Sequence, residues 1–175
     1  MNWVDELKRD AKTILPSIVE LRRALHRKPE IGNDLPETRA LVLEALSGLD
    51  FEIEESGSTT SFVATLKGES AGRCVLLRAD MDALPMPEDS GVDFASENPG
   101  RMHACGHDAH TAMLVGAARL MASRRDSLAG EIKFFFQAGE EGRMVLDENG
   151  MVPGMLLHAG VALEFLKGGG IDEQN

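Results

Sequence analysis

The chain has little cysteine and no long apolar run. Among its 175 residues only Cys74 and Cys105 are cysteines, and such low usage fits a reducing compartment better than a disulfide scaffold. No segment approaches the roughly eighteen consecutive apolar residues of a membrane-spanning helix. Residues 1–6 also lack the basic region and apolar stretch of a secretory signal. We therefore expect a cytoplasmic protein that is not inserted in a membrane.

Basic side chains are outnumbered by acidic ones. Lysine and arginine number 18 against 29 aspartate and glutamate, which gives a formal net charge of −11. Such a surface repels phosphate backbones and anionic lipid headgroups, so neither nucleic acid nor a membrane is an expected partner. The contents of 43% hydrophobic and 27% charged residues are ordinary for a folded protein. The length favours one domain, which we place at residues 1–166, followed by a glycine-containing tail or linker at residues 167–175.

Hydrophobic periodicity predicts three helices. Apolar residues recur at helical spacing over residues 3–26, and we expect this helix to be bent or restarted near Pro16, because proline removes a backbone donor. A loop at residues 29–36 leads to a second predicted helix at residues 37–49. The third predicted helix covers residues 107–127.

Strand patterns alternate with these helices. They cover residues 51–55, 61–67, 73–78 and 130–137. The third pattern is nearly continuous in apolar residues, which is typical of a strand covered on both faces. Helices and strands together predict an α/β fold.

One stretch of ten residues concentrates groups that bind metals. Residues 101–110 (RMHACGHDAH) contain three imidazoles, one thiol and one carboxylate, a donor set that suits zinc. Cys105 and His107, with only Gly106 between them, can turn toward one point at the start of the third helix. His110 lies one turn further on and is either a ligand or a residue that orients one. The alternative is a buried cysteine with unrelated surface histidines beside it.

Two pairs of carboxylates follow predicted strands. Asp80 and Asp82 come at the carboxyl end of the third strand, where open α/β sheets place their sites, although both can equally be loop acids that cap turns. Glu140 and Glu141 follow the last strand, and such a pair is often only an exposed turn. Beside a hydrolytic metal, however, one acid can hold the ion while the other moves the proton of the attacking water.

Four motifs in order resemble those of the metal-dependent N-acyl-amino-acid amidohydrolases. They are HRKPEIG at residues 26–32, LRADMDALP at 77–85, MHACGHDAHT at 102–111 and FQAGEEG at 136–142. This group includes hippurate hydrolases and plant indoleacetyl-amino-acid hydrolases, within the wider aminoacylase and carboxypeptidase superfamily. The resemblance implies a mixed central sheet flanked by helices, as in the catalytic domain of di-metal peptidases.

The resemblance also implies the reaction and the roles of five residues. Two divalent ions, zinc or else manganese, cobalt or nickel, would hydrolyse the amide bond between an acyl or aryl-acyl group and an amino acid. Cys105, His107 and Glu141 match metal ligands, and Glu140 matches the general base. Asp82 stands where the superfamily keeps an acid close to the metals, so we expect it to assist catalysis.

The sequence departs from this family in its last part. His158 is the nearest match to the next histidine ligand, but its spacing from Glu141 is shorter and its flanks differ. Neither the inserted lid domain nor the C-terminal return, which brings the last histidine ligand in this family, is matched, so we expect only the front half of the catalytic domain. An unpaired sheet edge should then favour homo-oligomers or association through that edge.

The expected activity of such a front half is impaired, and the alternative is a non-catalytic metal-binding or interaction fragment. A thiol redox role for Cys105 lacks a nearby resolving cysteine.

Overall fold

The computed structural model describes residues 3–142. The helices are α1 (Trp3–Arg27), α2 (Pro36–Leu46) and α3 (His107–Ala122), with a short 3-10 helix at Arg125–Ser127. The strands are β1 (Glu52–Glu55), β2 (Phe62–Lys67), β3 (Ser70–Asp80) and β4 (Ala129–Gln137). Each lies close to its predicted position, although α2 and α3 end earlier than expected. The predictions for His158 and for the tail from residue 167 lie outside the described residues.

The described strands form one mixed sheet in the order β1-β2-β4-β3. β1 with β2 and β2 with β4 are antiparallel, whereas β3 and β4 are parallel and are joined through α3. The parallel register sets Asp80 opposite Gln137, so β3 and β4 end side by side. The segments that follow these two strands therefore leave the sheet at the same edge. The predicted α/β class with a mixed sheet is confirmed.

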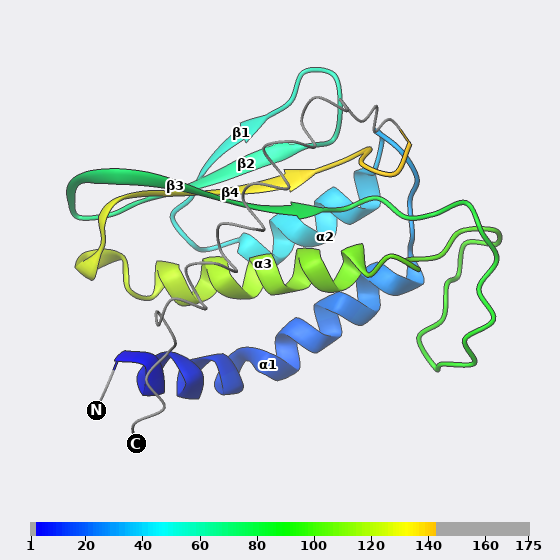
Figure 1. Cartoon of the computed structure of the whole chain (residues 1–175), viewed down its shortest axis with the longest axis horizontal. Coiled ribbons are helices and arrows are strands. Elements are labelled where there is room, and N and C mark those ends of the chain that lie inside the picture. Colours follow the sequence, from blue (N-terminus) through cyan, green and yellow to red (C-terminus); the bar gives the residue numbers. More distant parts are fainter. Residues whose placement is uncertain (1–2, 143–175) are drawn as a thin grey trace, which may run out of the picture. The chain divides into compact units, whose positions relative to one another are not determined.

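The core lies between the sheet and the helices. Figure 1 shows α1, α2 and α3 on one side of the sheet, with α3 nearer to it than α1. Phe62 of β2 and Phe136 of β4 are fully buried and stack with ring centroids 4.8 Å apart. Val115 and Ala118 of α3 are completely buried in the same apolar cluster. Burial of such side chains stabilises the fold by about 1.5–3 kcal/mol for each large one.

Helix α1 continues through Pro16 as one helix of 25 residues. The predicted restart is therefore wrong, whereas Figure 1 shows a change of direction between the two halves of the helix, in line with the predicted bend. The apolar side of α1, with Ile18 and Leu25 buried, packs in the same core cluster as α3 residues. This packing outweighs the one backbone hydrogen bond that proline removes.

Strand β3 is not covered on both faces as predicted. It pairs only with β4 among the described strands, and Val75, Leu76 and Leu77 are 50%, 55% and 38% exposed. Continuous apolar character indicates a strand meant for burial but cannot say whether the covering elements are present. Within the described residues, no helix is both long and apolar enough to cross a membrane.

Candidate metal centre

The predicted site residues come together where β3 and β4 end and α3 begins. Asp82 lies two residues beyond the end of β3, and Glu140 and Glu141 follow β4. Cys105 and His107 lie at the N-terminal end of α3, which crosses from β3 to β4. Between them Gly106 has a φ of 82°, a conformation that glycine adopts without strain. This turn brings the two side chains toward the same space.

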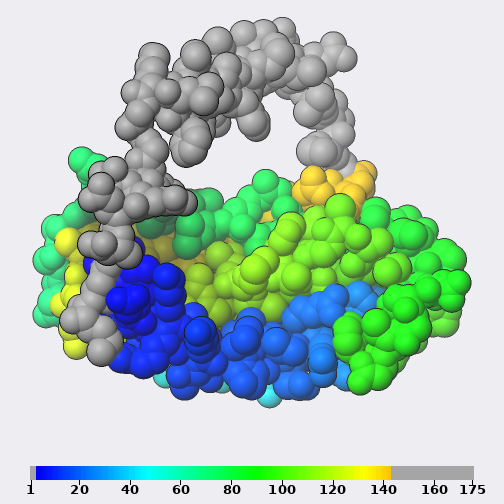
Figure 2. All heavy atoms as spheres, turned by 60° about the horizontal axis from the view of Figure 1, so that its bottom comes forward, coloured from blue at the N-terminus to red at the C-terminus, as the bar shows by residue number. Residues whose placement is uncertain are grey.

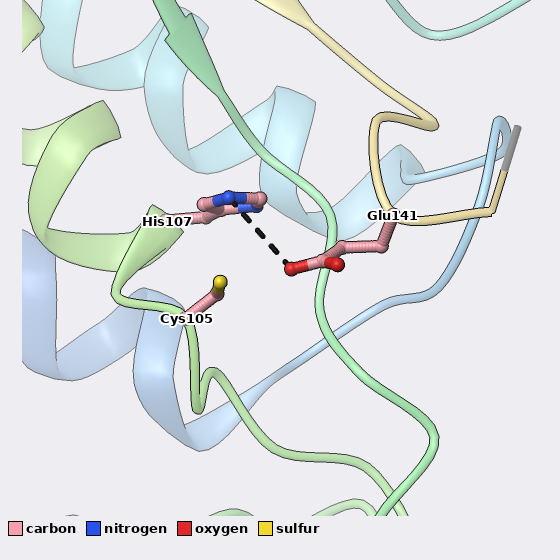
Figure 3. Close-up of side chains that lie close together, drawn as sticks. All are labelled: Cys105, His107 and Glu141. Carbon is pink, nitrogen blue, oxygen red and sulfur yellow. Dashed lines mark ion pairs between the residues drawn. The ribbon is translucent and has the colours of Figure 1, made fainter. Parts of the chain in front are cut away.

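Cys105, His107 and Glu141 form a group that can hold a metal ion. One ligand atom from each side chain lies within 4.8 Å of the others. Figure 3 shows the imidazole, the thiol and the carboxylate facing a common space. His107 Nε2 lies 3.9 Å from Glu141 Oε1. Nitrogen, sulfur and oxygen donors suit zinc, and three protein ligands leave a coordination position for water or substrate.

The ring of His107 is oriented by the backbone. Its Nδ1 lies 2.8 Å from the carbonyl oxygen of Asp82, and since a carbonyl only accepts, Nδ1 carries the proton. Nε2, the nitrogen that is free in the neutral tautomer, faces the glutamates, 3.9 Å from an oxygen of Glu140 and of Glu141. A hydrogen bond at one ring nitrogen is how proteins fix the other for metal binding.

Asp82 connects both sides of the site. It is 1% exposed, and its Oδ2 accepts a hydrogen bond of 2.9 Å from the backbone N–H of Glu141. Its Oδ1 and the Oε1 of Glu141 are buried without a hydrogen-bond partner among the described residues. Buried carboxylate oxygens are normally satisfied, and the unpartnered Oε1 belongs to Glu141, a member of the clustered group, which fits a cation bound there.

The negative charges around Cys105 also fit a bound cation. Its hydrogen bond with Glu141 and the negative charge of that residue raise the pKa of the Cys105 thiol. Burial and the charges of Glu140 and Asp82 raise it further. Three carboxylates beside one thiol repel a thiolate, and a divalent cation would reverse this balance. The residues present therefore fit a metal ion.

Two other predicted residues lie apart from this group. His110 is exposed, and although its ring centroid lies 5.7 Å from that of His107, it is not one of the clustered ligands. Asp80 instead pairs with Arg78 at 2.5 Å. Asp80 is the last residue of β3 and pairs within that strand, so it is neither one of the clustered ligands nor a loop acid that caps a turn.

Sequence reasoning gave no role to several buried polar residues behind the site. Asp108, directly after His107, is 1% exposed, and His26 Nδ1 lies 2.7 Å from its Oδ2. His103 is also buried, and burial lowers its pKa to about 4. The motif at residues 26–32 could have revealed this buried group. It contains His26 and Glu30, at and just after the end of α1, and both are buried although such residues are unusual in a core.

The chain is similar to a known protein family and to several of its members. The sequence model of the protein family described as Peptidase family M20/M25/M40 matches residues 76–173. "Thermostable carboxypeptidase 2" of Saccharolobus solfataricus is 46% identical over 142 residues, which are 81% of this chain and 36% of the relative. The "N-acyl-L-amino acid amidohydrolase" of Geobacillus stearothermophilus is 44% identical over 137 residues, 78% of this chain and 37% of the relative.

A solved structure agrees with the sequence relatives. The YXEP protein of Bacillus subtilis, described as a dinuclear metal-binding peptidase from the M20 family, matches with a TM-score of 0.71 and 39% identity. The match covers 74% of this chain and 36% of that one. The chain belongs to peptidase family M20/M25/M40, and the resemblance seen in the motifs is confirmed. It spans about a third of the length of the relatives it matches.

Proposed function

We propose that this chain carries the metal-binding part of a hydrolase that cleaves the amide bond of N-acyl amino acids. Cys105, His107 and Glu141 would hold a divalent cation, zinc in the first place, within a site for two ions. The observation that carries the proposal is the approach of their three ligand atoms within 4.8 Å beside Glu140. The similar YXEP structure is described as a dinuclear metal-binding peptidase, which supports the proposal of a second ion. His158 is a proposed ligand of that ion.

The chain's own residues divide the work of hydrolysis. A bound divalent cation supplies the positive charge that acidifies a water molecule and polarises the amide carbonyl. Glu140, with Oε2 at 3.9 Å from His107 Nε2, would take the proton of the attacking water and deliver it to the leaving amine nitrogen. Asp82 would keep His107 and Glu141 in place, since it contacts both.

The substrate class is drawn from the names of relatives. One is called an N-acyl-L-amino acid amidohydrolase, another an N-acetyl-L-cysteine deacetylase, and both describe removal of an acyl group from an amino acid. Manganese, cobalt and nickel remain alternatives to zinc, because thiolate and imidazole bind each of them. Free Cys74 and Cys105 support a reducing compartment such as the cytoplasm.

Release of the amino acid from hippurate and from N-acetyl amino acids tests the activity. We expect the zinc-loaded chain to release free amine, and Glu140→Gln to lower kcat by about 10²–10⁴ while zinc still binds. Glu54→Gln, on the exposed strand β1, is the matched control and should leave kcat unchanged. Zinc bound at Cys105 without turnover would favour a non-catalytic metal-binding role, and no bound zinc would overturn both.

The exposed edge of the sheet supports a proposal about association. Leu76 is 55% exposed on β3, whose outer side has no strand partner among the described residues. Such an edge favours pairing with a second copy of the chain. Sedimentation should therefore detect dimers that Leu76→Lys weakens, and a wild-type chain that stays monomeric at high concentration would reject the proposal.

A further inference from the structure

One short segment touches all the loops that build the metal centre. Residues 26–33, called here the support segment, run from the last turn of α1 into the loop before α2. The site itself comes from three places, namely the segment after β3, the start of α3 and the segment after β4. The support segment contacts each of these three places one residue away from a proposed site residue.

The first contact holds the start of α3. His26 Nδ1 lies 2.7 Å from Oδ2 of Asp108, the residue next to His107. The guanidinium of Arg22, one turn earlier on α1, reaches the same oxygen with Nε at 2.7 Å. The Asp108 side chain has no exposed surface, whereas that of Arg22 is 32% exposed, so the carboxylate itself is enclosed by its partners. The end of α1 thereby fixes the residue that follows a proposed ligand.

The second contact holds the segment that carries Asp82. The backbone N–H of Ala83 donates to the carbonyl oxygen of Glu30 at 2.8 Å. Glu30 cannot shift, because its buried carboxylate accepts hydrogen bonds from the backbone N–H of Glu37 and of Thr38 at the start of α2. This arrangement is an N-terminal helix cap supplied from outside the helix.

The third contact is a close approach of the support segment to the segment that carries the glutamate pair. A Cβ on Gly139 would lie 2.0 Å from Oδ1 of Asn33, so only glycine permits this approach. Asn33 is fixed in turn by Thr60, whose N–H and hydroxyl both donate to the Asn33 carbonyl oxygen, at 2.9 and 3.0 Å. The backbone just before Glu140 therefore passes directly against the support segment.

The loop at residues 86–98 completes the arrangement. His26 Nε2 lies 3.0 Å from Oε1 of Glu88, so the ring is held between two carboxylates. The loop is also tied by the N–H of Glu97, which donates to the Arg27 carbonyl at 2.7 Å. Figure 2 shows this green stretch of chain against the C-terminal half of α1. The contact with Glu88 on the other side of the ring thus restrains His26 from moving away from Asp108.

We propose that the support segment is a positioning device that sets the relative placement of Asp82, His107 and Glu141, so that metal affinity depends on residues that touch no metal. The inference rests on the proposed function in taking a divalent cation as the ligand. Three loops from distant parts of the chain pack against this one segment, so the segment sets their positions relative to one another. Outer partners of this kind commonly change metal affinity by about 10–100-fold.

Zinc affinity of the full chain, measured by competition with a chromophoric chelator, tests the proposal. We expect His26→Ala and Asn33→Ala each to weaken zinc binding by about 10–100-fold, with far-ultraviolet circular dichroism unchanged. Lys28→Ala is the control, because Lys28 lies in the same segment but pairs only at the surface with Glu37, at 2.8 Å. His26→Gln, which keeps one donor for Asp108, should recover part of the affinity. Wild-type affinity in both alanine variants would overturn the proposal.

Hydrogen exchange of the metal-free chain provides a second readout. His26→Ala should speed amide exchange at residues 104–110, and Asn33→Ala at residues 138–142, by about tenfold or more relative to Lys28→Ala. If His26→Ala does not fold, Asp108→Asn replaces it, because it keeps the side-chain shape and removes the charge. Should the wild-type chain bind no zinc, the proposed function fails, but exchange still decides the inference. Equal amide exchange rates in all variants would contradict the positioning role of the support segment.

Discussion

Gly139 illustrates how a single residue limits the geometry of the site. It has a φ of +76°, and an added Cβ would collide with the Asn33 side chain. Side chains other than glycine lose about 1–2 kcal/mol in this left-handed region before any collision is counted. The residue before the glutamate pair is therefore constrained twice, by its backbone angle and by its neighbour.

Gly139→Ala should lower the free energy of unfolding by about 1–3 kcal/mol and also weaken zinc binding. Urea unfolding followed by circular dichroism measures the first effect and chelator competition the second. Gly142→Ala is the matched control, because a Cβ there meets no atom within 4 Å. If the two variants unfold at the same urea concentration, the close approach to Asn33 is not a constraint.

The proposed ligands could be predicted from sequence, whereas their supports could not. Cys105 and His107 are separated by one residue, so their convergence follows from local geometry and a motif reveals it. His26 and Asp108 are 82 residues apart, and their pairing exists only after α1 has packed against α3. Asn33 and Gly139 are similarly remote, and only a folded chain shows why the glycine is required.

At the scale of elements, sequence periodicity located the helices and strands but not their surroundings. Pro16 predicts a bend or a restart, and α1 bends but continues as one helix with Ile18 and Leu25 buried on its inner side. The apolar run at residues 73–78 predicts a strand, which the structure confirms as part of β3, but the run alone does not show what covers that strand. Local patterns determine what an element is, and its neighbours determine how it is buried.

The loop at residues 86–98 is held by an unusually acidic carboxyl group. Burial opposes ionisation of Glu88, but hydrogen bonds from the Ser90 hydroxyl, the Ser96 N–H and the His26 ring outweigh it and hold the pKa of Glu88 at about 2. The ordinary value is 4.5, so between these two pH values the unfolded chain binds more protons than the folded one. The stabilisation is complete above pH 4.5 and is lost as the pH falls toward 2.

Glu88→Gln should therefore flatten the dependence of stability on pH in the acid range. At pH 7 we expect the variant to unfold more easily by about 1–3 kcal/mol, because a charged hydrogen-bond acceptor is lost. Urea unfolding at several pH values between 2.5 and 7 measures both effects. Glu54→Gln on β1 should keep the wild-type slope, and a Glu88→Gln curve that is parallel to wild type would contradict the assignment.

At the scale of the whole molecule, the described residues contain a folded sheet, its helices and the meeting point of three loops. The chain spans about a third of its relatives, and β3 ends the described sheet with apolar side chains exposed. The local centre should nevertheless bind metal, because its three ligand atoms already lie together and residues 26–33 pack behind the segments that carry them. Metal binding is thus the property on which the proposed hydrolysis and the positioning role both depend.

Alkylation of the two cysteines with and without zinc tests this claim most directly. Cys105 and Cys74 are both free and exposed, but Cys74 lies on β3 outside the cluster, so it is an internal control. We predict that zinc slows alkylation of Cys105 by about tenfold or more, leaves Cys74 unchanged, and loses its effect in Glu141→Ala. Peptide mass spectrometry measures both sites in one sample, and equal labelling of Cys105 with and without zinc would contradict the account.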